Sequence, residues 1–363
     1  HDVRVVDRRE GAGLETSFAN GGQISADHAA PWAGPGVPMQ ALKWMLQEDA
    51  PLLFRLRADP AQWRWGLQFL RNCTKARYRE NASRLQALGR YSRAQLQALR
   101  RETGIHYDEV ARGILVFHTG LVAPSGDWKT PDECVALEPA LAATRHGLQG
   151  GTYFAGDESG DAYKFTVALA NLCAAKGVRF DFGVSIQSFE QARQSLKADA
   201  YVVALGSYSP LLLRPLGIDL PIYPLKGYSV TMPVKDPAAA WTMSLSDESH
   251  KLVLSRLGDR LRIAGTAELN GYDTSINRVR CEAILKRVMA LFPDAGDASK
   301  ATYWAGLRPA TPSNLPCIGA TKIPGLFLNT GHGTLGWTHA CGSGRILADL
   351  MSGRRPEIDL EVR

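Results

Sequence analysis

The stretch GLFLNTGHGTLGWTHACGSGRILADL, residues 325–350, indicates which kind of fold the chain adopts. Its first part, GLFLNTG, has the short apolar run of a buried strand, and its last part has the apolar spacing of a helix that continues through Leu350. Between them, Gly331, Gly333 and Gly336 form a glycine-rich turn. Because the amides at a helix start carry partial positive charge, this turn predicts an anion site. Close helix–strand packing explains the glycines equally well.

The side chains around this turn leave the nature of the anion open. It is either a phosphate or the N1–C2=O edge of a reduced flavin. His332 and His339 are candidates for acid or base catalysis, although a histidine beside glycines is more often structural.

Length, composition, cysteine spacing and net charge exclude several classes of protein. The 363 residues suggest about two domains, and 45% apolar with 21% charged residues is ordinary for a soluble globular protein. No apolar run is long enough for a membrane span, and HDVRVVDRRE lacks the apolar core of a signal peptide. Six scattered cysteines without a CxxC pair favour reduced thiols in the cytoplasm and no metal site. The net charge of +6 is compatible with an anionic membrane surface, but no basic run with interleaved aromatics indicates nucleic acid binding.

The order of predicted elements indicates an α/β protein in which one domain is inserted into another. A strand opens the chain in HDVRVVD, residues 11–38 form a loop, and helices are expected from Met39 to about Gly104. GILVFH is a strand, residues 119–132 are a loop, and KFTVALANLCAAKG is a helix. VRFDFGVSI and AYVVALG are strands, the second of the parallel type. YSVTMPV, KLVLSRLG and LRIAGTAE alternate as antiparallel strands, and CEAILKRVMALFP is a further helix.

Two segments near the start of the chain have the chemistry of a nucleotide site. Asp7 ends the first strand, where dinucleotide-binding units place the acid that accepts hydrogen bonds from ribose; a solvated strand end is the alternative. ETSFANGGQIS, residues 15–25, combines short polar side chains with Gly21 and Gly22, which let the backbone approach a pyrophosphate and a flat polar ring. A plain surface turn would look similar.

Two later segments are candidates for substrate binding. In YWAGLRPATPSNLPCIG, Arg308 lies between a glycine turn and a proline, where a guanidinium on a stiff loop can bind a carboxylate through two parallel hydrogen bonds; a surface ion pair is the alternative. In YPLKGYSVT, Lys226, Tyr228 and Tyr223 stand at the start of the antiparallel strands, where a tyrosine hydroxyl could assist carboxylate binding and strand-edge packing is the alternative.

These segments, in this order, resemble the bacterial D-amino acid dehydrogenase family (small subunit) within the group that holds D-amino acid oxidase and glycine oxidase. The resemblance covers most of the chain and rests on LETSFANGGQIS, APWAGPGVP, GDESGDAYKFT, ADAYVVALGSYSP, PLKGYSVT, DESHKLVLSRLGDRLRIAGTAE, WAGLRPATP and LNTGHGTLGWTHACGSGR. It implies a Rossmann-like FAD-binding domain, incomplete at its N-terminus, with an inserted α+β substrate domain that contains a mixed, largely antiparallel sheet. The expected FAD domain spans 1–38, 146–220 and 302–363, and the substrate domain spans 39–145 and 221–301.

The resemblance also assigns roles to particular residues. Arg308 matches the arginine that binds the substrate carboxylate, with Tyr228 and Lys226 as further catalytic candidates. The residues that match FAD-binding positions of the family are Asp7, Arg8, Thr16, Ser17, Asn20, Gly21, Gly22, Gln23, Ile24, Val184, Ala204, Leu205, Gly206, Gly331, His332, Gly333, Thr334, Leu335 and Gly336.

The resemblance implies oxidative deamination of D-amino acids, D-alanine among them, to 2-oxo acids and ammonia. Hydride passes from the α-carbon to flavin N5, no side-chain base is required, and the electrons go to a quinone-type acceptor. The alternatives are a glycine, sarcosine or cyclic imino acid enzyme, such as one for D-hydroxyproline, and a protein without FAD or activity. Peripheral attachment to the inner membrane is compatible with the charge.

The chain departs from the family pattern at four places. The family has a strand, a GxGxxG turn and a helix before HDVRVVD, so a chain that begins at His1 is expected to bind FAD poorly. Between His118 and Asp132, and between Ser185 and Asp199, the family segments are longer. His28 stands where a tyrosine is expected.

Overall fold

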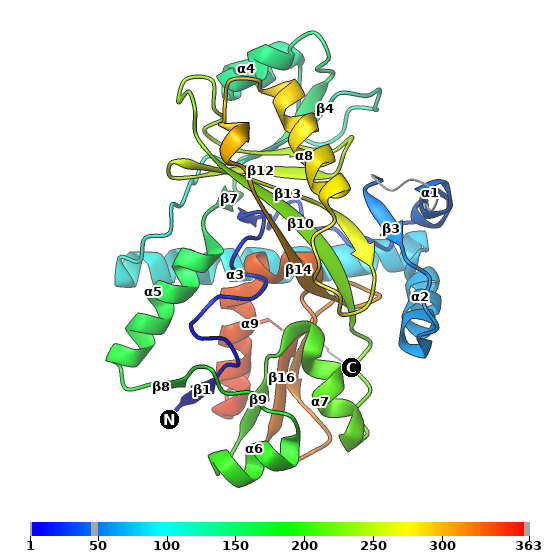
Figure 1. Ribbon diagram of the computed structural model, residues 1–363. Coiled ribbons are helices and arrows are strands. Elements are labelled where there is room, and N and C mark those ends of the chain that lie inside the picture. The colour runs from blue at the N-terminus through cyan, green and yellow to red at the C-terminus, as the bar shows by residue number, and fades with distance from the viewer. Residues whose placement is uncertain (1, 45–49, 359–363) are drawn as a thin grey trace.

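The largest element is a mixed sheet of nine strands that forms the upper half of the molecule in Figure 1. The computed structural model describes residues 2–44 and 50–358. The strand order is β14-β10-β13-β12-β11-β4-β6-β5, and β3 also pairs with β13. The bounds are β3 Leu52–Phe54, β4 Ile114–His118, β5 Trp128–Lys129, β6 Gly150–Phe154, β10 Tyr223–Pro233, β11 Ser244–Asp247, β12 Leu252–Leu257, β13 Arg260–Leu269 and β14 Thr302–Ala310.

Three small sheets complete the strands of the described residues. β1 (Arg4–Val6) pairs in parallel with β8 (Arg179–Asp181), and β2 (Gln23–Ile24) pairs with β7 (Glu158–Ser159). β16 (Leu326–Thr330) lies between β15 (Cys317–Ala320) and β9 (Tyr201–Val203), with β9 parallel to it. The pair β1–β8 and the group around β16 lie below the large sheet in Figure 1.

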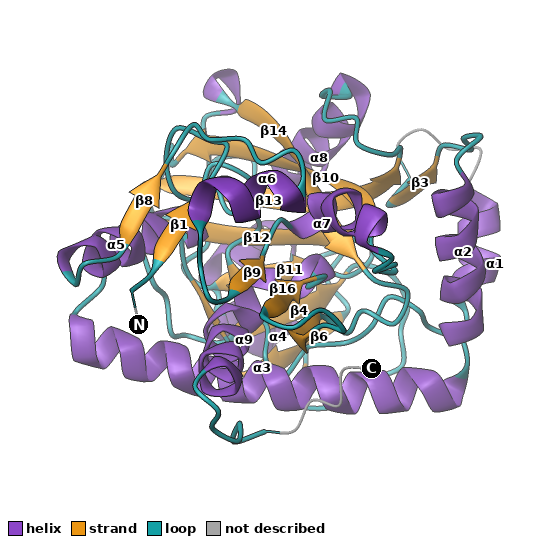
Figure 2. Cartoon of the chain, turned by 90° about the horizontal axis from the view of Figure 1, so that it is seen from below, coloured by secondary structure: helices purple, strands orange, loops and turns teal. Residues whose placement is uncertain are grey.

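Helices cover the outside of these sheets, and in Figure 2 the long α3 crosses α9. The α-helices are α1 Val37–Trp44, α2 Pro60–Asn72, α3 Lys75–Thr103, α4 Pro131–Leu137, α5 Ala162–Ala175, α6 Phe189–Leu196, α7 Ser209–Leu213, α8 Arg278–Leu291 and α9 Gly336–Met351. The 3-10 turns are η1 Pro139–Thr144, η2 Gly206–Tyr208, η3 Arg214–Leu216, η4 Ala298–Lys300 and η5 Gly333–Leu335. Within the described residues, none of the helices has the length and apolarity that a bilayer crossing requires.

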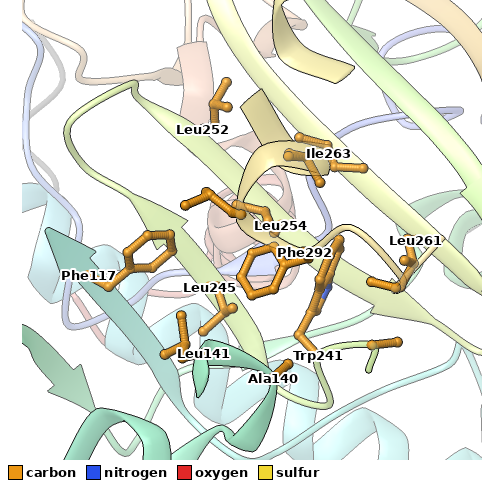
Figure 3. Close-up of a cluster of buried hydrophobic side chains, with 14 of the residues drawn as sticks. Phe117, Ala140, Leu141, Trp241, Leu245, Leu252, Leu254, Leu261, Ile263 and Phe292 are labelled. Atoms are coloured by element: carbon orange, nitrogen blue, oxygen red, sulfur yellow. The ribbon is translucent and has the colours of Figure 1, made fainter. Parts of the chain in front are cut away.

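The main hydrophobic core lies on the side of the large sheet that α8 covers (Figure 3). Strand residues such as Leu245, Leu254 and Ile263 are fully buried there, and Trp241 packs against Phe292 with ring centroids 5.1 Å apart. Strand alternation puts every second residue on this side and leaves the others to face the rest of the molecule. The other side of the same strands is therefore available to form a site.

The crossing of α3 and α9 explains one of the glycines in the segment 325–350. The Gly342 amide donates to Ser92 Oγ at 2.9 Å, and a Cβ on Gly342 would lie 2.7 Å from the Cβ of Ser92. Glycine at this position therefore permits close packing between the two helices.

Most predicted elements are confirmed. The opening strand, the strand at 113–118, the helices at 164–177 and near 281–293, and the strand–turn–helix of 325–350 are present. β9 is parallel to β16, and β10, β12 and β13 pair in antiparallel fashion as predicted.

Two expectations need correction. The predicted helical segment 39–104 contains β3, because Leu52–Phe54 follows Pro51 and pairs with β13; residues 45–49 of that segment lie outside the described residues. The loop at 119–132 contains β5 and the start of α4.

The segment between Ser185 and Asp199, which is longer in the family, forms α6 in this chain. Its N-cap Ser188 accepts a hydrogen bond from the amide of Gln191.

The predicted division into two domains stays a prediction. Two strands from segments that it assigns to the FAD domain, β6 and β14, pair within the nine-stranded sheet. β14 enters that sheet because it is paired with β10 along nine residues without a register shift.

Replacing Leu254 tests the main core. Leu254→Ala removes a fully buried side chain and is expected to lower the free energy of unfolding by roughly 2–5 kcal/mol. Leu67→Ala, at a side chain that is 59% exposed, is the matched control and is expected to change it by about 0.5 kcal/mol or less. Urea unfolding followed by circular dichroism measures both, and equal effects would contradict this assignment of the core.

Candidate functional site

A cavity of about 2090 Å³ lies between the large sheet and the strands below it. Its walls come from β1, the loop around Asn20, the segment 184–187, the end of β9, strands β10, β13 and β14, and the turn 332–338. Most of the predicted cofactor residues line this one space. The two that do not are Ile24, which is fully buried in the core, and Gly331.

The end of the cavity near β1 has the features expected for a ribose. Asp7 follows β1, and its Oδ1 accepts from the amide of Arg9 at 2.8 Å. Its backbone carbonyl accepts from the amide of Val184 at 3.0 Å, which brings the segment after β8 beside it. Arg8 pairs with Glu15 and lies 4.0 Å above the ring of Tyr208. A carboxylate with a free oxygen and a nearby cation suits a sugar with attached phosphates.

The loop 15–25 is attached to the large sheet by hydrogen bonds near its start and near its end. The Thr16 hydroxyl donates to the carbonyl of Leu307 at 3.1 Å, and Asn20 Oδ1 accepts from the amide of Gly22 at 2.9 Å. Gln23 Nε2 donates to Ser244 Oγ at 2.9 Å and to Ser246 Oγ at 3.1 Å. The polar side chains of this loop thus fix its shape, and much of its surface toward the cavity is backbone.

Sequence reasoning missed Arg262, which holds the same loop from the sheet. Its Nη1 donates to the carbonyl of Asn20 at 3.2 Å and its Nε to Thr231 Oγ1 at 2.6 Å. Arg262 is buried, and desolvation lowers the pKa of its guanidinium to about 10. The one sequence signal was an arginine inside the alternating strand LRIAGTAE, where the side chain must find a buried acceptor.

Three glycines let the backbone line the cavity directly. Gly22, Gly206 and Gly333 have φ values of 75°, 54° and 54°, in the left-handed region that glycine adopts without strain. Ala204 and Leu205, just before Gly206, also line the cavity and are exposed within it. The backbone can therefore approach a ligand without side chains in between.

The N-terminus of α9 opens into the same space. Residues His332 to Thr338 line the cavity, and the N-cap residue Leu335 supplies no side-chain acceptor for the first amides of the helix. Uncapped amides of a 16-residue helix attract an anion or an electron-rich carbonyl.

The two histidines of this segment are neutral at neutral pH. Desolvation lowers the pKa of His332 to about 4 and that of His339 to about 3. His339 is fully buried and contacts the carbonyl of Leu85 at 3.3 Å, away from the cavity. His332 lines the cavity, and its Nε2 is buried without a partner. Neither histidine has the pKa of an effective base near pH 7.

Arg308 is the one arginine of β14, and its guanidinium lies at the cavity wall. Nη1 donates to the carbonyl of Thr266 at 2.9 Å. No described carboxylate forms an ion pair with it. Desolvation lowers the pKa of the guanidinium to about 10, so it remains protonated at neutral pH. An unpaired charge of this kind favours an anionic ligand.

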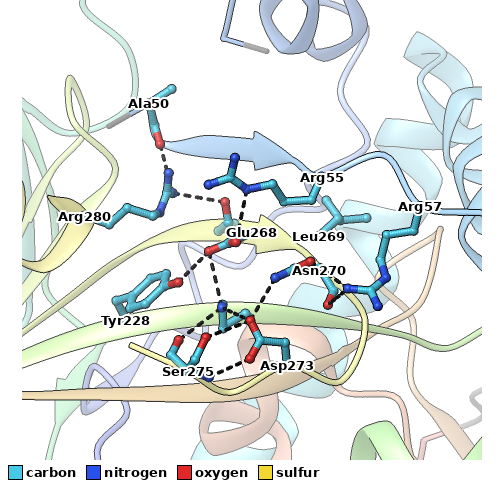
Figure 4. A network of polar contacts seen from close by, with 12 residues as sticks. Ala50, Arg55, Arg57, Tyr228, Glu268, Leu269, Asn270, Asp273, Ser275 and Arg280 are labelled. Carbon is cyan, nitrogen blue, oxygen red and sulfur yellow. Dashed lines mark hydrogen bonds and ion pairs between the residues drawn. The ribbon is translucent and has the colours of Figure 1, made fainter. Parts of the chain in front are cut away.

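Lys226 and Tyr228, the further catalytic candidates, lie on the face of β10 opposite Arg308. Arg308 is paired with Leu225, and Gly227 with Gly306, so strand alternation turns Lys226 and Tyr228 to the opposite face of β10. Figure 4 shows Tyr228 beside Glu268, and its hydroxyl donates to Glu268 Oε2 at 2.5 Å. Lys226 Nζ lies 3.5 Å from the same oxygen. Burial and this bond raise the pKa of Tyr228. Tyr228 borders the cavity, but its hydroxyl is directed away from Arg308.

The cavity fits a dinucleotide with a flat ring. It combines glycine backbone in left-handed conformations, an uncapped helix N-terminus, a carboxylate at the far end and the buried, unpartnered Nε2 of His332. These groups match the phosphates, ribose and polar ring edge of such a molecule.

Comparison with known proteins identifies the cofactor. The profile of the family described as FAD dependent oxidoreductase matches residues 1–350. The chain belongs to this family. FAD is therefore its cofactor, and the residues around Asn20, Gly206 and Gly333 are those that would hold it.

Two relatives of this FAD-dependent oxidoreductase are D-amino acid dehydrogenases. That of Dechloromonas aromatica (strain RCB) is 52% identical over 387 residues, which cover 98% of this chain and 93% of the relative. That of Paramagnetospirillum magneticum (strain ATCC 700264 / AMB-1) is 54% identical over 387 residues, covering 99% and 92%. The family predicted from the sequence is confirmed.

Solved structures confirm the fold. Glycine oxidase from Geobacillus kaustophilus superposes with a TM-score of 0.72 at 22% identity, covering 99% of this chain and 90% of that one. L-alpha-glycerophosphate oxidase from Mycoplasma pneumoniae, solved with FAD bound, has a TM-score of 0.64 at 15% identity, covering 96% and 88%.

Gly333 tests the assignment of the cofactor turn. Gly333→Val forces a β-branched residue into a left-handed conformation, at a cost of about 1–2 kcal/mol, and should weaken FAD binding about tenfold. Gly344→Ala, in α9 with open space around the added methyl, is the matched control. Titration of the apoprotein with FAD, followed by flavin fluorescence, measures both, and equal affinities would remove Gly333 from the site.

Proposed function

We propose that the chain catalyses the FAD-dependent oxidative deamination of D-amino acids to 2-oxo acids and ammonia. The observation that carries this proposal is the charged, unpaired guanidinium of Arg308 at the wall of the cavity that accommodates the cofactor. An α-amino acid supplies the carboxylate that this guanidinium lacks. The names of the two relatives support D-amino acids as the substrate class.

The side chains of the site bind and orient the substrate. Arg308 holds the carboxylate, which leaves the α-carbon and its hydrogen turned toward the cofactor side of the cavity. FAD, when bound, would supply the acceptor for the α-hydrogen, which leaves the α-carbon as a hydride together with its electron pair. The neutral His332 adds no positive charge that would oppose loss of the amine proton. Water then hydrolyses the released imino acid to the 2-oxo acid and ammonia.

The alternative substrates are glycine, sarcosine and cyclic imino acids. The likeness to glycine oxidase, at 22% identity, concerns the fold alone. A panel of D-alanine, glycine, sarcosine and D-hydroxyproline with a dye acceptor separates the two classes, since only the alternative requires a preference for glycine or secondary amines.

Arg308 provides the direct test. Arg308→Ala should raise the KM for D-alanine by roughly thirtyfold or more, because loss of a charge-assisted bidentate contact costs about 2 kcal/mol or more. Arg145→Ala, at an exposed arginine paired with Asp132, is the control that removes a similar charge elsewhere. Steady-state kinetics with a dye acceptor measures both, and an unchanged KM in Arg308→Ala would refute the proposed role.

We further propose a quinone-type electron acceptor and peripheral attachment to a membrane through the surface of α2. Trp63, Leu67 and Leu70 follow each other at four and three residues on this helix, and each is more than half exposed. Arg64 and Arg71 lie beside this apolar stripe, and α2 stands at the edge of the molecule in both views (Figures 1 and 2). An apolar stripe flanked by arginines is typical of helices that lie on anionic lipid.

Vesicle binding tests this surface. Leu67→Glu combined with Leu70→Glu should reduce co-sedimentation with vesicles of phosphatidylglycerol and phosphatidylcholine by about tenfold, since it replaces the two most apolar contacts with charges that lipid repels. Val279→Glu, at an apolar residue of α8 that is 55% exposed, is the control. Binding that is absent in the unchanged chain, or equal in all three proteins, would contradict the proposal.

A further inference from the structure

The position of the Arg308 guanidinium depends on two neighbouring strands as well as on its own. Arg308 is paired with Leu225 on β10, yet its guanidinium extends across β10 and donates to the carbonyl of Thr266 on β13. It passes over Gly227, the residue between the pairs Lys226–Glu268 and Tyr228–Gly265. The side chain thus crosses a full strand to reach this acceptor, the single one that it has among the described residues.

Gly227 provides the space for this crossing. A Cβ on Gly227 would overlap with Cζ and Nη2 of Arg308, closer than real Cβ atoms approach other atoms. The φ of Gly227 is not in the left-handed region, so the backbone there does not require glycine. The reason for glycine at this point of the ladder is therefore the guanidinium that lies over it.

Thr266 provides the acceptor through an unusual backbone conformation. Thr266 and Ala267 together oppose Gly227, so the ladder contains a β-bulge on β13. Thr266 has a φ of 55°, which is strained for a β-branched residue, and its own hydroxyl is buried without a partner. The side chain does not explain the conformation, whereas the hydrogen bond that the Thr266 carbonyl accepts from Arg308 does.

The neighbour of β13 changes at this same residue. β12 pairs with β13 up to Gly265, and β3 pairs with it from Ala267 onward. The amide of Ala267 donates to the carbonyl of Pro51 at 2.7 Å, on the side away from β10. Thr266 therefore lies between the segments of β13 that pair with β12 and with β3, where its carbonyl can accept from Arg308 in place of a neighbouring strand.

The buried polar network in Figure 4 fixes the residues after the bulge. Glu268 is 2% exposed and contacts Tyr228 and Lys226. The Arg280 guanidinium donates to the carbonyl of Ala267 at 3.2 Å. The arrangement gives Lys226 and Tyr228 a structural role on the face of the sheet opposite Arg308.

We infer that Gly227 and the bulge at Thr266 form a seat that positions the Arg308 guanidinium for the substrate carboxylate. This inference rests on the proposed function of Arg308. In this arrangement one guanidinium edge is occupied by the Thr266 carbonyl and the remaining donors face the ligand. Gly227 and Thr266 are positioning residues that act through Arg308, and neither is expected to bind the amino acid through a side chain.

A double-mutant cycle tests the seat. Gly227→Ala should weaken binding of propionate, a carboxylate that is not oxidised, and raise the KM for D-alanine, each by about tenfold. In the Arg308→Ala background the same change should alter either quantity by less than about twofold, because the group that it displaces is gone. Thermal unfolding shifts with propionate give the affinity, and steady-state kinetics gives the KM. Ser229→Ala, two residues along β10, is the control.

The outcomes separate the inference from the function on which it rests. If Arg308→Ala leaves propionate binding and the KM unchanged, the proposed function fails. A different result is that Arg308→Ala weakens propionate binding and raises the KM, while Gly227→Ala has no effect or has an additive effect in the double variant. That result would contradict the positioning role of Gly227 and would leave the proposed function of Arg308 intact. If Gly227→Ala does not fold, Arg308→Ala should restore soluble protein by vacating the space, and failure to restore it would overturn the inference.

Discussion

A protonated guanidinium held in a recessed cavity without a carboxylate is the constraint on which this site depends. Burial of an unpaired charge is costly, and the protein supplies Arg308 with a single carbonyl in place of an ion pair. Supplying even that carbonyl requires a bulge on β13, a glycine on β10 and a change of partner strand from β12 to β3. The charge remains only partly satisfied, which leaves most of its hydrogen-bonding capacity to a ligand.

The cofactor side and the substrate side of the cavity share one wall, the large sheet. The loop that follows Thr16 is tied to this sheet by Gln23 and by Arg262, and Arg262 lies on β13, the strand that also carries Thr266. The Thr16 hydroxyl reaches the carbonyl of Leu307, next to Arg308. Because the residues proposed to bind the cofactor and the substrate are attached to the same strands, the relative position of these residues depends on a rigid sheet and on few flexible connections.

The two faces of the large sheet are chemically distinct because strand side chains alternate. On one face of β10, Tyr228 and Lys226 belong to a buried network around Glu268 that borders the apolar core. On the other, Gly227 lies beneath the guanidinium of Arg308. A shift of one residue in the register between β10 and β14 would exchange these faces and bury Arg308 in the core. The pairing of β14 with β10 without a register shift therefore keeps Arg308 on the cavity face of the sheet.

The sequence by itself determined the class of fold and the family, and it predicted glycine turns and an arginine that the structure places along one cavity. Glycine-rich turns next to strands, apolar periodicity and an arginine on a short proline-flanked segment are local features, so GHGTLGW, ANGGQ and GLRP could be read directly. Local pattern did not reveal that Leu52–Phe54 is a strand, since its partner β13 lies more than two hundred residues away in the chain. Nor did it reveal that Lys226 and Tyr228 face away from Arg308, or that Gly227 and Thr266 hold its guanidinium. Those facts depend on register and on which strands become neighbours, and only the tertiary structure decides both, because long-range pairing is not encoded in any single segment.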